Sequence, residues 1–139
     1  MQKGLIVSAV IFNSEKEVLL LKRASTEDVY PDYWDIPGGT LEDGEDPEKG
    51  IQREIFEETG LSIENLSLFG HISNIDITKN KQFVRLEFIA AFSSGEVSLN
   101  PAEHQEYKWV KLSELKNYIC IPYMYTIPEK LKNHALLVF

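Results

Sequence analysis

Runs of β-branched, leucine and aromatic residues separated by short polar turns dominate the hydrophobic pattern of this chain. They predict strands over residues 5–12, 17–23, 66–77, 82–92 and 106–110. Only four polar residues, 13–16, separate the first two runs, which is a spacing typical of a hairpin. Residues 34–36 form a short extended piece that leads into a Pro-Gly-Gly turn at 37–39.

Helices are indicated by their end signals. Asp46 is a good N-cap, Pro47 suits the first helical position and Gly60 suits the position just past the end, so we predict a helix over residues 47–59. Ser113 caps a short helix through residue 117, and residues 128–134 form a C-terminal helix. With no internal repeat or linker, this pattern predicts one α/β (α+β) domain over residues 1–139.

Composition narrows the class of protein. A chain of 139 residues with 43% hydrophobic and 26% charged residues can bury a core and is typical of a soluble globular protein. Cys120 is the sole cysteine, which favours a reducing compartment. No apolar run approaches the length of about 18 residues that a membrane span needs. We therefore expect a cytoplasmic protein that does not contact membranes.

The charge is strongly acidic and unevenly distributed. The net charge is −8, and no basic stripe of the kind that binds nucleic acid is present, so we expect no nucleic-acid partner. Eight of the 22 acidic residues lie within residues 42–58, where Lys49 and Arg53 are the only cations. By composition alone such a run is a solvated helix face. The spacing of its glutamates indicates a more specific role.

Three glutamates of the predicted helix share one side of it. At 100° per residue, Glu54, Glu57 and Glu58 fall within an arc of about 100°. The arc borders Ile51 and Ile55, the stripe expected to pack on the sheet, so Glu58 should be partly enclosed. Like charges at these spacings repel by about 0.2–0.5 kcal/mol per pair. This arrangement therefore predicts a bound hard cation such as Mg²⁺, which prefers oxygen ligands.

Gly50 lies in the middle of the same arc. Glycine inside a helix costs about 1 kcal/mol relative to alanine. A glycine at this position is expected to allow close approach of another backbone segment, which we predict to be residues 38–39.

The spacing of these residues carries a family resemblance. From 39 to 61 the pattern comprises Gly39, Glu45, Arg53, Glu54, Ile55, Glu57, Glu58, Gly60 and Leu61. It resembles the Nudix box, and the chain resembles MutT-like Nudix hydrolases. The resemblance implies the Nudix fold, a mixed β-sheet sandwiched between helices. It also implies Mg²⁺-dependent hydrolysis of a nucleoside diphosphate linked to another group, with Mn²⁺ able to substitute.

The resemblance also implies roles for individual residues. It assigns metal binding to the carboxylates of Glu54, Glu57 and Glu58 and to the carbonyl of Gly38. It pairs Arg53 with Glu45 in a contact that steadies the loop against the helix.

The general base is left open among Glu57, Glu103 and Glu106. Glu103 stands six residues before Trp109, a position that serves as ligand or base in MutT-like relatives, whereas other branches favour a residue nearer the strand.

Candidate substrate contacts are Arg23, Trp34 and Gly39. Arg23 ends a strand where a cation could meet phosphates, and Trp34 could stack on a base. A nucleoside triphosphate is the expected substrate. ADP-ribose or a nucleotide sugar is the alternative, and a nucleotide-sensing module without turnover is a second one. The oligomeric state is not readable from the sequence, and a homodimer is left open.

No other chemistry competes strongly. An isomerase of the isopentenyl diphosphate type would need a catalytic cysteine, but Cys120 lies among apolar residues, where an inert thiol is expected. His71, His104 and His134 lack metal-ligand spacing, so we expect them to be at the surface or hydrogen-bonded.

Overall fold

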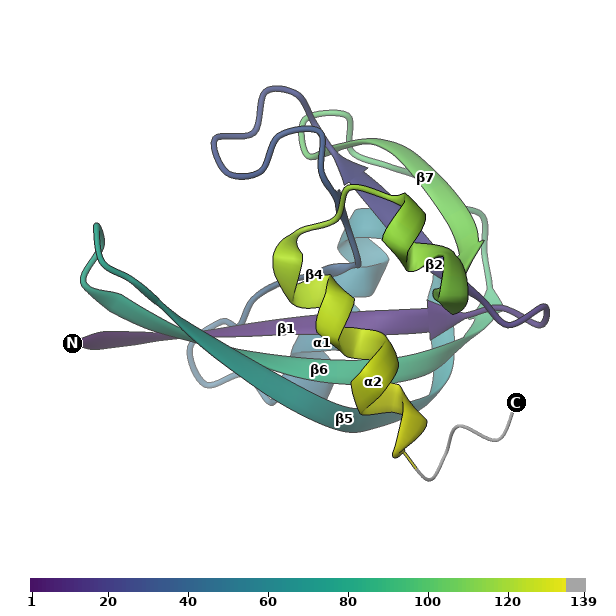
Figure 1. Ribbon diagram of the computed structural model, residues 1–139. Helices are drawn as coiled ribbons and strands as arrows, with labels where there is room; N and C mark the ends of the chain where they lie inside the picture. Colours follow the sequence, from purple (N-terminus) through teal and green to yellow (C-terminus); the bar gives the residue numbers. More distant parts are fainter. Residues whose placement is uncertain (135–139) are drawn as a thin grey trace.

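The hydrophobic runs form a single mixed sheet of seven strands in the computed structural model, which describes residues 1–134 (Figure 1). The strands are β1 (Gln2–Phe12), β2 (Glu17–Arg23), β3 (Trp34–Asp35), β4 (Gly38–Thr40), β5 (Ser62–Asp76), β6 (Lys81–Ser94) and β7 (His104–Lys111). The helices are α1 (Pro47–Thr59) and α2 (Ile127–Lys132), with 3₁₀ helices η1 (Leu112–Asn117) and η2 (Pro122–Thr126).

The central strand β1 changes partner along one of its edges. The main strand order is β3-β2-β1-β6-β5, and β7 extends the sheet beside β2. β1 runs parallel to β6 over its whole length but meets β2 only near the hairpin, where Phe12 lies opposite Val18. Farther along the same strand, residues 6–8 pair with β4 instead. The exchange brings the two glycines of β4 to the middle of the sheet.

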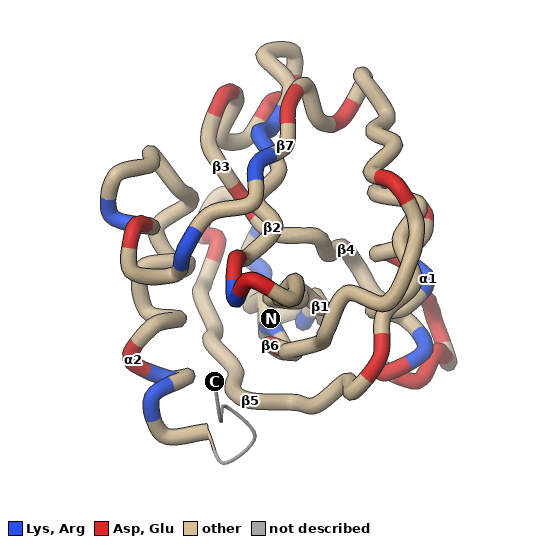
Figure 2. Tube along the Cα trace, turned by 90° about the vertical axis from the view of Figure 1, so that its right-hand side faces the viewer, with Lys and Arg blue, Asp and Glu red and all other residues tan. Residues whose placement is uncertain are grey.

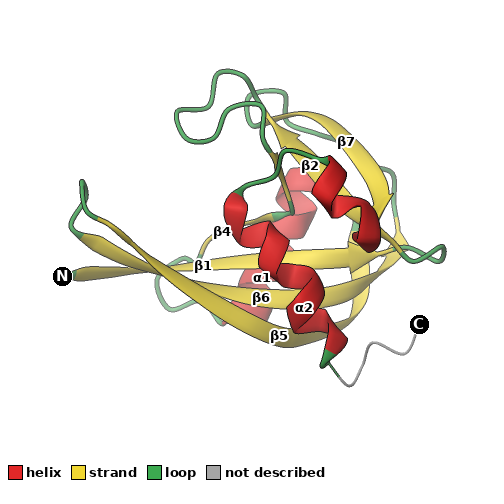
Figure 3. Cartoon of the chain, viewed as in Figure 1, coloured by secondary structure: helices red, strands yellow, loops and turns green. Residues whose placement is uncertain are grey.

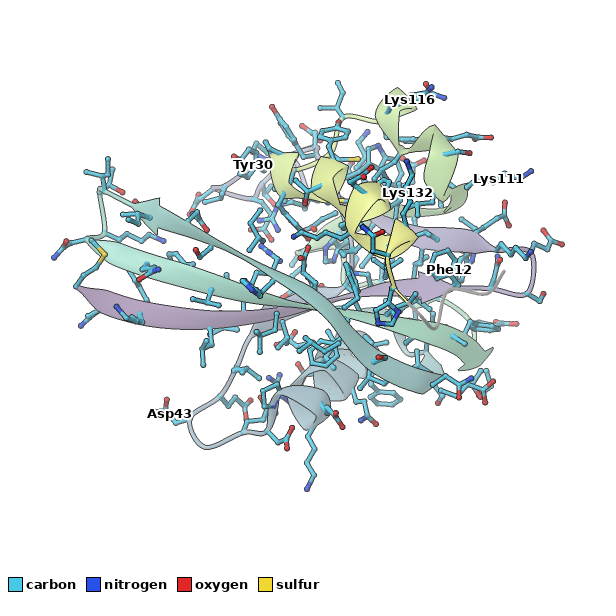
Figure 4. The ribbon with its side chains drawn as sticks, turned by 60° about the horizontal axis from the view of Figure 1, so that its bottom comes forward. Phe12, Tyr30, Asp43, Lys111, Lys116 and Lys132 are labelled. Carbon is cyan, nitrogen blue, oxygen red and sulfur yellow. The ribbon has the colours of Figure 1, made fainter. Side chains whose placement is uncertain are left out.

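Two hydrophobic clusters cover the two faces of the sheet. Because strand side chains alternate, Val10 and Phe12 of β1 point into one cluster, while Ala9 and Ile11 point into the other. The first cluster is closed by η1, η2 and α2, and the second is closed by α1. Figure 4 shows this layering, with the loop that carries Asp43 and α1 on one side and α2, with Lys132, on the other.

The predicted helix over residues 47–59 is confirmed with the same ends. Asp46 accepts a hydrogen bond from the Glu48 amide, and Gly60 adopts the left-handed conformation with φ of 73°. Both isoleucines of the predicted packing stripe, Ile51 and Ile55, are fully buried. Local capping and periodicity were therefore sufficient to place α1.

Other elements differ from the sequence prediction. The segment read as a turn continues into β4, which pairs with β1 although it carries no hydrophobic alternation. β5 begins at Ser62, four residues before the predicted start at 66. The helix predicted at 113–117 is the 3₁₀ helix η1. The C-terminal helix predicted over 128–134 is α2, which begins at Ile127 and ends at Lys132, and it follows an unforeseen 3₁₀ helix, η2.

The loop at residues 24–33 meets the end of the loop at residues 95–103 beside the start of β7 (Figure 3). The Ala24 amide donates to the Glu103 carbonyl at 2.8 Å, and the Gln105 side chain donates to the Arg23 carbonyl, also at 2.8 Å. These contacts hold the start of β7 against the end of β2. They bring Glu103 to the edge of the sheet where β4 and α1 meet.

Candidate active site

β4 contacts both β1 and α1 so closely that it needs two glycines. A Cβ on Gly38 would lie 2.2 Å from the Val7 carbonyl oxygen, which belongs to the backbone of β1. A Cβ on Gly39 would lie 2.5 Å from the carboxyl carbon of Glu54. Gly38 thus permits the strand pairing, and Gly39 leaves room for a carboxylate of α1.

Glu58 is a buried acid that points from α1 toward β4. Its side chain accepts a hydrogen bond from the Gly38 amide at 2.8 Å, and the residue is only 7% exposed. Burial raises the pKa of Glu58 to about 9, and the nearby carboxylates of Glu54, Asp35 and Glu103 add to the increase. The Gly38 amide opposes that increase. A buried carboxyl group in this setting is stabilised in its charged form by a cation.

Glu54 and Glu57 occupy different environments. Burial raises the pKa of Glu54, whose side chain is 14% exposed and accepts a hydrogen bond from Arg53 at 3.0 Å. Glu57 has a side chain that is 57% exposed and bonds to the same guanidinium at 3.2 Å. Of the three glutamates predicted to bind metal, the structure places Glu54 and Glu58 in one cleft and turns Glu57 toward Arg53.

The predicted pair of Arg53 and Glu45 is present. The guanidinium donates two hydrogen bonds to the carboxylate, at 2.7 and 2.9 Å, and lowers the pKa of Glu45 to about 2. The remaining contact of Arg53 outside the glutamates is with the Thr40 carbonyl, at 3.3 Å. Arg53 therefore joins α1 to the end of β4 and the following loop.

Gly50 allows a close approach, but by a different segment from the one predicted. A Cβ there would lie 2.3 Å from a methyl group of Leu41 and 2.9 Å from a carboxylate oxygen of Glu45. The loop after β4, rather than residues 38–39, packs on this turn of α1. The prediction named the wrong segment because β4 was not recognised as a strand that carries the chain past the helix.

A cleft of about 270 Å³ opens where these elements meet. Its lining consists of Arg23, Glu27, Asp35, Ile36, Gly38, Gly39, Glu54, Glu58, Glu103 and His104. Among the candidates for a general base, Glu103 lines the cleft. Glu106 is exposed on β7 opposite Lys22 and does not line it, nor does Glu57.

Four residues of the cleft were not predicted, Glu27, Asp35, Ile36 and His104, and two of them, Asp35 and His104, are buried polar residues. His104 is 5% exposed, and its Nδ1 lies 3.6 Å from a carboxylate oxygen of Glu58. Burial lowers the pKa of His104, so its imidazole is neutral at pH 7. Asp35 accepts hydrogen bonds from the Ile36 amide at 2.8 Å and from the Tyr123 hydroxyl at 2.5 Å. The only local signal was position, since His104 directly follows Glu103 and Asp35 directly follows Trp34.

A larger hollow of about 570 Å³ adjoins the cleft and shares Arg23 and Asp35 with it. Its walls come from β1, β5, β6 and η2 and include Phe83, Arg85 and Tyr123. The Arg85 guanidinium lies 3.9 Å from the centre of the Tyr123 ring, a cation–π contact.

Trp34 does not line the cleft or the hollow. It is 7% exposed, belongs to the core on the α2 side and makes an edge contact with Tyr118 at 5.6 Å between ring centres. Its burial leaves no open face for a nucleobase. The apolar setting predicted for Cys120 is confirmed nearby, since burial raises the pKa of that thiol to about 11.

Acidic residues concentrate along α1 and the loop before it (Figure 2). Across residues 1–134, no helix combines the length and the apolar character that crossing a bilayer demands.

A mixed sheet between helices, with glutamates of one helix facing a glycine strand, defines a Nudix-type domain. The chain belongs to the family of the NUDIX domain, whose family model matches residues 2–127. Nucleoside triphosphatase NudI of Klebsiella pneumoniae is 33% identical over 131 residues, which cover 85% of this chain and 89% of that protein.

Two further proteins are similar to this chain, one over almost its whole length and one over about half of it. The crystal structure of the MutT protein from Methanosarcina mazei superimposes with a TM-score of 0.79 at 27% identity, covering 96% of this chain and 97% of that one. NAD-capped RNA hydrolase NudC of Haemophilus influenzae is 44% identical over 71 residues, or 51% of this chain. The match spans only 25% of that longer protein.

Proposed function

We propose that the protein is a Mg²⁺-dependent pyrophosphohydrolase. It would cleave the phosphoanhydride bond of a nucleoside diphosphate linked to another group, with a nucleoside triphosphate as the preferred substrate class. The observation that carries this proposal is the buried Glu58 carboxyl, held by the Gly38 amide beside Glu54 in an acidic cleft. Family membership supports the same chemistry.

The proposed metal ligands are Glu54 and Glu58, which line the cleft, the carbonyl of Gly38, and Glu57, whose side chain would have to turn from Arg53 into the cleft to bind the ion. All are oxygen donors, as Mg²⁺ prefers, and the high pKa of Glu58 reflects the cost of charging a buried carboxyl group, which a bound cation would offset. A divalent cation at this position supplies charge neutralisation on phosphate oxygens and lowers the pKa of a bound water. Mn²⁺ would substitute for it.

Glu103 is the proposed general base. It lies in the cleft beside Glu58, where it can accept a proton from an attacking water, whereas Glu57 is engaged by Arg53 and Glu106 lies outside. Arg23 lines both the cleft and the adjoining hollow, so we propose that it contacts the phosphates. Gly39, which also lines the cleft, is the second proposed substrate contact.

The hollow beside the cleft is the proposed place for the nucleoside half of the substrate. Phe83 and Tyr123 offer apolar ring surface there, and Arg85 offers hydrogen-bond donors. The relative matched along most of its length is named a nucleoside triphosphatase, which supports the triphosphate class. The net charge of −8 argues against capped RNA as the preferred substrate.

The experiment that tests the proposal is a substrate panel. The protein is incubated with Mg²⁺ and with nucleoside triphosphates, ADP-ribose, nucleotide sugars and an NAD-capped oligoribonucleotide, and the products are separated by chromatography. We expect release of pyrophosphate and a nucleoside monophosphate from one or more triphosphates. If the protein cleaved only another compound of the panel, the class of that compound would replace nucleoside triphosphates as the proposed substrate. If it cleaved none of them, a nucleotide-sensing module without turnover would be favoured.

Substitution of the glutamates separates the chemistry from the fold. Glu58→Gln and Glu57→Gln should each reduce kcat by several orders of magnitude, because each removes a proposed oxygen ligand, while circular dichroism and the melting temperature stay near wild type. The matched control is Glu64→Gln, which removes the charge of an exposed glutamate on β5 and should retain full activity. Either test variant keeping more than about a tenth of the wild-type rate would contradict its assignment as a ligand.

A further inference from the structure

His104 has a buried nitrogen without a partner. Its Nδ1 is inaccessible to solvent and makes no hydrogen bond within residues 1–134. The nearest carboxylate oxygen of Glu58 is 3.6 Å away, beyond hydrogen-bond distance. Buried polar atoms are almost always satisfied, so an unpaired nitrogen on a residue that lines the cleft calls for a partner such as an ion.

The surroundings of this nitrogen supply further ligand atoms. One carboxylate oxygen from Glu58, one from Glu103 and a ring nitrogen of His104 lie within 4.8 Å of one another. Donor atoms that share one ion at bonds of about 2.0–2.2 Å lie roughly 3–4 Å from one another. The three side chains therefore need only small adjustments to share a single ion.

The backbone holds two of the three side chains in place. The His104 amide donates to the Asn100 carbonyl at 2.9 Å, and the Glu103 carbonyl accepts from the Ala24 amide at 2.8 Å. Glu58 is fixed from the other side by the Gly38 amide. The group is thus assembled from α1, which carries Glu58, and from the start of β7, where His104 follows Glu103, before any ion arrives.

We propose that Nδ1 of His104, together with one carboxylate oxygen of Glu58 and one of Glu103, forms a mixed nitrogen–oxygen site for a first-row transition ion such as Mn²⁺ within the active-site cleft. The second oxygen of Glu103 is then the one that accepts the proton in its proposed role as base. The inference rests on the proposed function in one respect, that the cleft holds a divalent cation. It adds two ligands, Glu103 and His104, to those proposed above. Because imidazole suits first-row transition ions better than Mg²⁺, the site should discriminate between the two classes.

The test measures metal binding without substrate or turnover. Mn²⁺ is titrated into the intact protein, and pulsed electron paramagnetic resonance detects whether a nitrogen is directly bound. The variants are His104→Gln and, as a matched control, His71→Gln, which changes an exposed histidine on β5. We expect nitrogen coupling in the wild type and in His71→Gln and none in His104→Gln. Mn²⁺ affinity should fall about 10–100-fold in His104→Gln, with Mg²⁺ affinity changing far less.

Several results would overturn the inference. Mn²⁺ binding to the wild type without nitrogen coupling would do so even if His104→Gln failed to fold, since that measurement needs no variant. Equal losses of Mn²⁺ and Mg²⁺ affinity in a folded His104→Gln would also overturn it. Failure of the wild type to bind either ion would instead refute the metal-dependent function as a whole.

Discussion

Arg53 hydrogen-bonds to the carboxylates of Glu45, Glu54 and Glu57, so one guanidinium sets the position of three acidic side chains. Its planar fork matches the Glu45 carboxylate, a geometry that lysine cannot reproduce. Without it, the loop after β4 loses its main tie to α1, and Glu54 loses the hydrogen bond that opposes the rise in its pKa.

Arg53→Lys should therefore reduce kcat/KM by about 10–100-fold, because the charge is kept but the carboxylates are no longer oriented. The measurement is steady-state hydrolysis of the best substrate from the panel. Lys49→Gln removes a positive charge from an exposed position of the same helix and should leave kcat/KM unchanged. A fully active Arg53→Lys would show that the fork has no part in orienting the site.

Among the secondary-structure elements, β4 contacts β1 through Gly38 and α1 through Gly39. The first contact is expected to matter for stability and the second for function. Gly38 faces the backbone of β1, which cannot move without breaking the strand pairing. Gly39 faces the end of the Glu54 side chain, which can rotate away. The same substitution at adjacent positions should therefore have different consequences.

Gly38→Ala should lower the free energy of unfolding by about 1–3 kcal/mol or more, since the added methyl overlaps backbone atoms. Gly39→Ala should keep most of the stability but lose activity and divalent-ion affinity, because it displaces Glu54. Urea denaturation and calorimetric titration with Mg²⁺ measure the two effects. If Gly39→Ala were the less stable of the pair, the distinction between the two contacts would be wrong.

At the scale of the whole molecule, Glu58 makes stability depend on pH. Its pKa is about 9 in the folded protein and 4.5 when unperturbed, so between those values the folded state holds a proton that the unfolded chain has released. Stability of the metal-free protein should therefore fall as the pH rises through this range. The lowered pKa of His104 changes the stability only below pH 6.5, the ordinary pKa of histidine. The lowered pKa of Glu45 changes it only below pH 4.5.

From pH 7 to pH 9, Glu58 contributes to the pH dependence of stability while His104 and Glu45 do not. The free energy of unfolding in the presence of a chelator should fall by at most about 1.4 kcal/mol per pH unit. Saturating Mg²⁺ should weaken or reverse this slope, because ion binding favours the deprotonated carboxylate. Glu58→Gln should lose the Glu58 share of this slope and keep only that of Glu54, whose pKa burial also raises. An equal slope in that variant would mean that Glu58 is not the group that titrates.

Local sequence was enough to predict α1, its ends and the glutamates that it presents. Those features depend on contacts within a few residues, such as the Asp46 cap, the left-handed Gly60 and the repeat that buries Ile51 and Ile55. The pairing of Arg53 with Glu45 could be predicted from the sequence because the family pattern already links the two positions.

Which other residues join α1 at the cleft depends instead on long-range pairing in the sheet. β4 forms because residues 38–40 pair with a strand about thirty residues earlier in the chain, and it has no periodicity of its own. Pairing of β7 with β2 brings Glu103 and His104 to Glu58, while burial removes Trp34 from the substrate. Local patterns do not encode such contacts, because each depends on where the sheet places segments that are distant in the chain.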